Sequence, residues 1–96
     1  MEDIDCGEVF VPNAFSPNDD NLNDELYVRG KCIKTMTFII YDRWGEIVFQ
    51  SEDKDFGWDG KSKGNKLGAA VFTYYLKATL LDNSMVEKHG EINLIR

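Results

Sequence analysis

The residues of this 96-residue chain best suited to chemistry gather in one loop. Residues 18–24 read Asn-Asp-Asp-Asn-Leu-Asn-Asp, which offers carboxylate and amide oxygens at the density that Ca²⁺ sites use. The run is not an EF-hand loop, because it lacks the central glycine and the bidentate glutamate at the twelfth position. Asn and Asp side chains also accept hydrogen bonds from nearby loop amides. The sequence therefore predicts a structural network of Asx turns first, and leaves open a Ca²⁺ site with Asn18, Asp20 and Asp24 as ligands.

Few residues of the chain could act in catalysis, since it has a single histidine, His89. A nucleophile and base would need a serine or cysteine beside this histidine and a third group to orient it. No such combination of acid, base and nucleophile can be assembled around a cleft, and abundant acidic side chains on a small β domain usually form a solvated face. We therefore predict a protein that is not an enzyme and that has no cofactor, apart from the open Ca²⁺ site.

The two cysteines, Cys6 and Cys32, flank the Asn/Asp loop. An even count in a small, acidic, β-rich chain favours an exported protein with one disulfide, worth about 3 to 4 kcal/mol in the chain-entropy model. The alternative is two buried thiols that pack as small hydrophobic groups. A metal site is disfavoured, because no further cysteine or paired histidine completes a set of four ligands.

The composition indicates one acidic domain. The chain is 43% hydrophobic and 12% aromatic, enough for a single core, with residues 1–7 as a leader segment and 8–96 as the core. A net charge of -6 and a pI near 4.6 argue against nucleic acid or an anionic membrane as a partner. No apolar run is long enough for membrane insertion, and no signal peptide is visible at the start. We expect a monomer.

The apolar segments alternate with period two, which indicates strands, and no window has the helical period. In the segment 36–41, Met36, Phe38 and Ile40 share one face and the other face is also largely apolar, so burial on both faces is predicted. The predicted strands are residues 8–11, 26–29, 36–41, 46–50, 71–81 and 86–95.

Turn residues separate these strands. Asp42–Gly45 predicts one hairpin, Asp82–Ser84 predicts another, and Gly90 predicts a bulge or bend in the last strand. Short strands with turns between them predict an all-β fold, an antiparallel immunoglobulin-like β-sandwich of about six to eight strands.

The two tryptophans, Trp44 and Trp58, carry the largest apolar side chains of the chain, and each is next to a glycine. Either could close over the core at a sheet edge or stay exposed as a platform on which a sugar stacks. Burial is predicted for both. Asp59 follows Trp58 directly and is predicted to accept hydrogen bonds from amides of its own turn.

Several motifs occur together in a fixed order. They are Pro12–Phe15 followed by Pro17 and Asn18, then Ile40–Gly45 followed by Val48 and Phe49, then Trp58–Gly60, then Gly90, and finally Leu94–Arg96. In this order and spacing the chain resembles the type B C-terminal sorting domain, also called the gliding motility-associated C-terminal domain, of type IX secretion system cargo in Bacteroidota. The resemblance runs from about Glu8 to Arg96, with departures at Asp19, Asn21 and Ala70, where the family pattern has glycine.

The resemblance implies a sorting signal for protein secretion, recognised as a folded domain with an accessible C-terminal strand. It implies passage through the periplasm to the cell surface or medium, and a partner in the outer-membrane secretion machinery that includes a PorP/SprF-like protein. The candidate recognition residues are Asp20, Asn23, Asp24, Arg43, Trp44, Trp58, Asp59, Leu94, Ile95 and Arg96.

Two other classes of function stay open. A carbohydrate- or ligand-binding immunoglobulin-like module would need an exposed aromatic platform or a Ca²⁺-organised loop. A structural repeat of a surface adhesin would be followed by similar domains in the parent protein.

Overall fold

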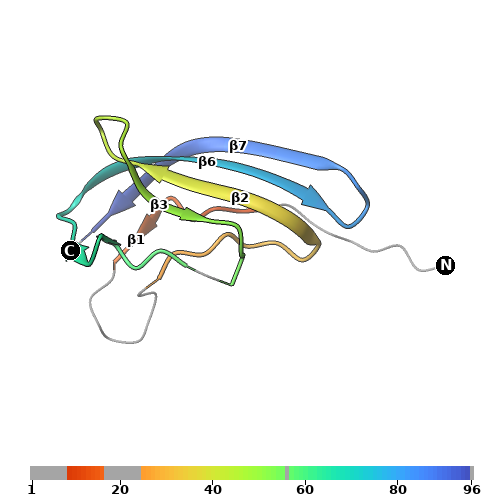
Figure 1. Cartoon of the computed structure of the whole chain (residues 1–96), viewed down its shortest axis with the longest axis horizontal. Helices are drawn as coiled ribbons and strands as arrows, with labels where there is room; N and C mark the ends of the chain where they lie inside the picture. Colours follow the sequence, from red (N-terminus) through yellow and green to blue (C-terminus); the bar gives the residue numbers. More distant parts are fainter. Residues whose placement is uncertain (1–8, 17–24, 56, 96) are drawn as a thin grey trace.

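The chain forms an all-β domain in the computed structural model, which describes residues 9–16, 25–55 and 57–95. Its strands form a five-stranded sheet in the order β1-β7-β6-β2-β3 and a small two-stranded sheet of β4 and β5 (Figure 1). The strands are β1 (Ala14–Phe15), β2 (Ile33–Tyr41), β3 (Ile47–Ser51), β4 (Lys61–Ser62), β5 (Asn65–Lys66), β6 (Ala70–Leu80) and β7 (Met85–Leu94). The predicted fold class is confirmed.

Most strand pairs of the main sheet are antiparallel, as predicted. The strands β6 and β7 form the longest hairpin, from Ala70 opposite Leu94 to Thr79 opposite Met85, and β2 pairs with both β6 and β3. The exception is β1, which runs parallel to β7. Because β1 and β7 are far apart in the sequence, no hairpin turn dictates their relative direction.

A second layer of extended chain covers one face of the sheet. Phe10 and Arg29 exchange two backbone hydrogen bonds of 2.7 and 2.8 Å, and Leu26 and Trp58 exchange two of 2.8 and 3.0 Å. The predicted strands at 8–11 and 26–29 are therefore wrong in extent, because the described residues there form single bridges. Pro12, which has no N–H to donate, directly follows the first bridge region and prevents the ladder from continuing.

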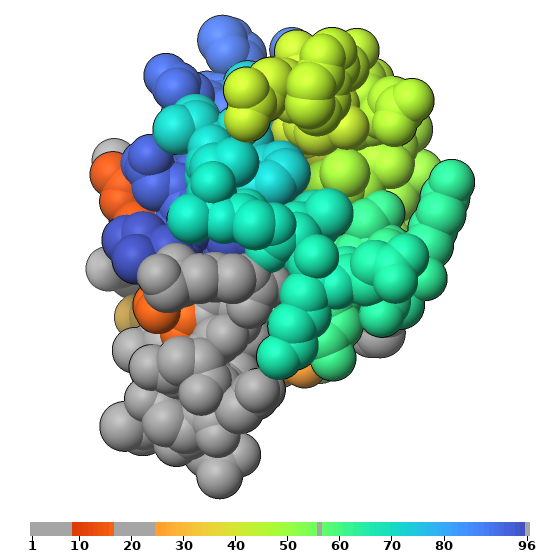
Figure 2. All heavy atoms as spheres, turned by 90° about the vertical axis from the view of Figure 1, so that its left-hand side faces the viewer, coloured from red at the N-terminus to blue at the C-terminus, as the bar shows by residue number. Residues whose placement is uncertain are grey.

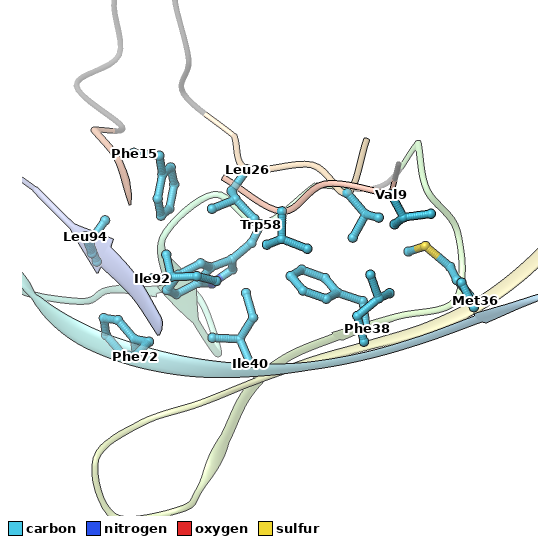
Figure 3. Close-up of a cluster of buried hydrophobic side chains, with 14 of the residues drawn as sticks. Val9, Phe15, Leu26, Met36, Phe38, Ile40, Trp58, Phe72, Ile92 and Leu94 are labelled. Atoms are coloured by element: carbon cyan, nitrogen blue, oxygen red, sulfur yellow. The ribbon is translucent and has the colours of Figure 1, made fainter. Parts of the chain in front are cut away.

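The core lies between the two layers (Figure 3). Trp58 is fully buried at its centre, with its ring centroid 5.2 Å from that of Phe15 and 5.1 Å from that of Phe72. From β2, Met36, Phe38 and Ile40 point into the core, whereas the alternate side chains on the outer face are half-buried. The prediction of burial on both faces of this strand is thus wrong, because none of the residues that the structure describes forms a layer over the outer face.

Gly90 lies in an unbroken stretch of the β6–β7 ladder, opposite Tyr74. The predicted bulge at this glycine is therefore wrong. A Cβ at Gly90 would lie 3.0 Å from a ring carbon of Tyr74. The glycine is needed because the tyrosine ring packs across the neighbouring strand, a contact that sequence periodicity does not reveal.

Several predictions fall on residues outside the described part of the chain. These include Cys6, the loop residues 18–24 with the Ca²⁺ ligands proposed for it, and Arg96. Cys32 is buried, with 3% of its surface exposed. The disulfide and the Ca²⁺ site therefore stay predictions.

Candidate recognition surface

The hairpin between β2 and β3 ends in a tightly bonded turn. One carboxylate oxygen of Asp42, Oδ1, accepts hydrogen bonds from the backbone N–H of Trp44 at 2.8 Å and of Glu46 at 2.9 Å. The backbone N–H groups of Asp42 and Gly45 donate to the carbonyls of Glu46 and Asp42, at 2.9 and 3.1 Å. Gly45 has a φ of 83°, in the left-handed region that glycine enters without steric cost. The turn is thus closed by its own polar groups.

This closed turn presents Arg43 and Trp44 to solvent. Trp44 is 76% exposed, and the guanidinium carbon of Arg43 lies 5.0 Å from the centroid of its ring, a cation–π distance. The hairpin projects on the side of the sheet away from the core (Figure 3). The predicted burial of Trp44 is therefore wrong, because the bonds to Asp42 close the turn on a hairpin that projects away from the core.

A hollow of about 220 Å³ lies beside Trp44. It is lined by residues 42–44, 48 and 67–72, so it joins the hairpin to the start of β6. Val71 at its rim is 46% exposed, and Ile47, on the outer face of β3 opposite Tyr41, is 51% exposed. Sequence reasoning missed this hollow, because exposed apolar residues at strand ends give the same signal as core residues.

The segment that contains Trp58 differs from the hairpin tip, because its tryptophan lies in the core. The indole N–H of Trp58 donates to the carbonyl oxygen of Lys61 at 3.1 Å, and Oδ1 of Asp59 accepts from the backbone N–H of Lys61 at 3.0 Å. The predicted roles of both residues in the fold are confirmed: Trp58 is buried and Asp59 is an exposed turn acceptor. Of these two candidates, only Asp59 is available for contact with another molecule.

The end of β7 is held between two neighbours. The N–H of Asn93 donates to the carbonyl of Asn13 at 2.8 Å, and that of Ile95 donates to the carbonyl of Phe15 at 3.0 Å. Leu94 is buried at 2% exposure, whereas Ile95 is 53% exposed. The expectation of an accessible C-terminal strand is therefore wrong for the backbone N–H groups of Asn93 and Ile95, which are bonded to Asn13 and Phe15, and right for the side chains of both residues, which are exposed.

The comparison with protein families shows to which family the chain belongs. The family described as CHU_C Type IX secretion signal domain matches residues 9–94 of the chain. The chain belongs to this family. It is therefore a signal domain that directs export by the type IX secretion system to the cell surface or medium, as its motifs predicted. A comparison with curated protein sequences gave no significant match.

Solved structures share the fold of this signal domain. One is PorZ, described as an essential bacterial surface component of the type IX secretion system of Porphyromonas gingivalis: it is 22% identical with a TM-score of 0.58, over 92% of this chain and 11% of PorZ. Another is CopC from Methylosinus trichosporium OB3b, 12% identical with a TM-score of 0.57, over 91% of this chain and 93% of CopC. At these identities the likeness concerns the fold alone.

Two motifs of the signal domain, the hairpin tip and the end of β7, lie at one end of the molecule together with the start of β6 (Figures 1 and 2). We call this the motif end and define it as the hairpin tip 42–46, residues 67–71 and the end of β7 at 93–95. Figure 3 places Phe15 and Leu94 toward this end of the core, and Val9 and Met36 at the opposite end. Segments that are far apart in the sequence therefore form one surface only when the domain is folded.

The described residues were also compared with the requirements of metal sites, catalytic sites and membrane spans. No group of three or more His, Cys, Asp or Glu side chains within them could hold a metal ion. His89 is exposed on β7. Within the same residues, no helix is long and apolar enough to cross a membrane.

Proposed function

We propose that a component of the type IX apparatus recognises the folded domain in the periplasm through the motif end, with Arg43 and Trp44 as the central contacts. The observation that carries the proposal is the 76% exposure of Trp44 on a turn that is fixed by Asp42. The partner that we propose is a PorP/SprF-like outer-membrane protein. Recognition by surface contacts needs neither catalysis nor a cofactor, and the proposal includes neither.

The chemistry of the hairpin tip suits such a contact. Trp and Arg are the residues most often found at binding hot spots, where truncation to alanine costs about 2 kcal/mol or more. Because the turn is already ordered by its internal hydrogen bonds, binding loses less conformational entropy than it would with a flexible loop. The apolar hollow next to Trp44 offers a place for a side chain of the partner.

The position of the motif end also suits a signal carried on a larger protein. Val9 lies at the opposite end of the core from Leu94 (Figure 3). Cargo that joins the chain before Val9 would thus meet the described core at the end opposite the motif end, so one surface could serve many different cargo proteins.

The test is a reporter that carries a Sec signal peptide, a fluorescent protein and residues 1–96. We expect Trp44→Ala and Arg43→Ala to reduce the exported fraction about tenfold or more, since 1.4 kcal/mol of lost binding is a factor of ten. The matched control is Leu81→Ala, which removes an apolar side chain that is 57% exposed in the turn between β6 and β7. Normal export of both hairpin variants, with melting curves like that of the wild type, would refute the proposal.

A second candidate function is carbohydrate binding, which the exposure of Trp44 favours. The adjoining hollow of about 220 Å³ is small for this purpose, because ligand pockets usually have about 300–1,000 Å³. The fluorescence of Trp44 offers a direct test with cellohexaose, xylohexaose and laminarihexaose. A saturable change that Trp44→Ala abolishes would favour the carbohydrate module over protein recognition.

A further inference from the structure

Most of one edge of the main sheet has no partner strand. β7 spans Met85–Leu94 and pairs with β6 along its whole length, but on its other side β1 reaches only Asn93 and Leu94. Beyond these two residues, no backbone hydrogen bond to that side of β7 occurs within the described part of the chain. Figure 1 shows β1 as a short arrow beside the end of β7. The edge from Met85 to Glu91 is thus open.

The bonds to β1 identify which peptide groups face this open edge. The N–H groups of Asn93 and Ile95 point away from β6, toward the carbonyls of Asn13 and Phe15. Peptide groups alternate in direction along an antiparallel strand. The N–H and C=O groups of Glu87, His89 and Glu91 must therefore face outward, whereas those of the residues between them bond to β6.

The open edge is well shaped for another strand. The register between β6 and β7 is unbroken, so no bulge twists the edge away. The side chains of Glu87 and Glu91 lie on the outer face of the sheet and are exposed. An incoming strand would therefore meet an unbroken row of donors and acceptors, flanked by the carboxylates of Glu87, which lies opposite Lys77 of β6, and of Glu91, which lies opposite Thr73.

We propose that this edge accepts an extended segment of a partner protein with basic side chains at alternate positions, by strand addition in line with β1. The proposal rests on the proposed function, because the partner segment would belong to the same secretion component that binds the motif end. Backbone hydrogen bonds would provide the affinity, and pairing of Lys or Arg with Glu87 and Glu91 would provide the preference for basic segments.

A second copy of this chain is a poorer occupant of the edge. Each chain has a net charge of -6, so two copies repel. An antiparallel pair centred on His89 would also place Glu87 of one copy opposite Glu91 of the other, and like charges directly opposite each other destabilise a strand pair.

Amide hydrogen exchange tests the geometry first. In the free domain, the amides of Glu87, His89 and Glu91 should exchange faster than those of Lys88 and Gly90. A synthetic seven-residue peptide of alternating lysine and valine is the probe, and it should slow exchange at the three outward amides alone. Protection of these amides that rises with domain concentration would overturn the proposal in favour of self-association, and no protection by the probe would also overturn it.

His89→Pro tests the function of the edge. Proline is tolerated on an edge strand where its nitrogen faces solvent, so this variant removes one outward donor and leaves the bonds to β6 intact. A second variant, Glu87→Lys with Glu91→Lys, reverses the charge, and Glu52→Lys with Asp55→Lys makes the same change of charge elsewhere on the exposed surface. We expect both edge variants to bind the probe about tenfold more weakly and to lose export, while the control keeps both.

The outcomes separate this inference from the proposed function. Suppose that His89→Pro melts like the wild type and is exported normally, while Trp44→Ala is not exported. The motif end is then the recognised surface, and strand addition is wrong. If both are exported normally, the proposed function is wrong as well. If the edge variants lose probe binding and export while Trp44→Ala keeps export, the edge itself is the recognised surface.

Discussion

Replacement of Trp58 by alanine tests the description of the core. The side chain has no exposed surface, and its ring lies 5.2 Å from Phe15, 5.1 Å from Phe72 and 6.5 Å from Phe49. Its indole N–H also satisfies the carbonyl of Lys61 at 3.1 Å. Removing a buried tryptophan costs about 3–5 kcal/mol, because apolar burial and ring contacts are lost and a cavity remains. A domain of this size has only about 5–15 kcal/mol in total.

The measurement is urea unfolding at neutral pH, together with a thermal melt. At about 4–8 °C per kcal/mol, the loss predicts a midpoint lower by roughly 12–40 °C, so the variant would be partly unfolded in the cell. Trp58→Phe keeps a ring in the cluster and should lose less than half as much. Trp44→Ala is the matched control, because an exposed tryptophan should contribute within about 0.5 kcal/mol of zero. A Trp58→Ala variant that melts within a few degrees of wild type would refute this account of the core.

The remaining predictions concern the disulfide, the Asn/Asp loop and a turn carboxylate. Protein purified under oxidising conditions should take up no alkylating reagent at Cys6 or Cys32, and reduction should lower the free energy of unfolding by about 3–4 kcal/mol; two reactive thiols in that protein would contradict the bridge. Millimolar Ca²⁺ should leave the melting midpoint close to its value in chelator, and a shift of many degrees would show that the loop at 18–24 binds the ion in the folded state. Hydrogen bonds from the hydroxyl and amide of Ser84 lower the pKa of Asp82 below its ordinary value of 3.8. Asp82 should therefore contribute stability that is complete above its unfolded pKa and lost as the pH falls through its folded pKa. Asp82→Asn should show a smaller decline in the free energy of unfolding between pH 5 and pH 2 than wild type, and an equal decline would rule out this contribution.

The sequence predicted the long strands well, because alternation of apolar side chains is a local property. The strand predicted at 71–81 corresponds to β6 (Ala70–Leu80), and its inward side chains are Phe72, Leu76, Ala78 and Leu80, as expected. The two-residue strand β1 has no periodicity to detect. Its pairing with β7 depends on contacts between distant segments, which a single sequence does not specify.

The two tryptophans show where the prediction of the site failed. Each has an adjacent glycine and a nearby aspartate, so burial is predicted from the sequence for both. The difference lies in the position of the aspartate. Asp42 precedes Trp44 and accepts the backbone N–H of Trp44 itself, which holds the backbone in a turn outside the core, where the indole is exposed. Asp59 follows Trp58 and accepts the N–H of Lys61, which leaves the indole free to enter the core.

Under the proposed function the two tryptophans have separate roles. A recognition residue must be exposed, so it can add little to stability, while the scaffold that holds it must be stable enough to keep it rigid. In this domain Trp58 and the aromatic side chains around it contribute to the stability of the core, and the backbone turn that carries Trp44 is held by hydrogen bonds that do not involve the core. Substitutions at the hairpin tip should therefore change recognition without changing folding. Substitutions around Trp58 should change both together, because the motif end exists only in the folded domain.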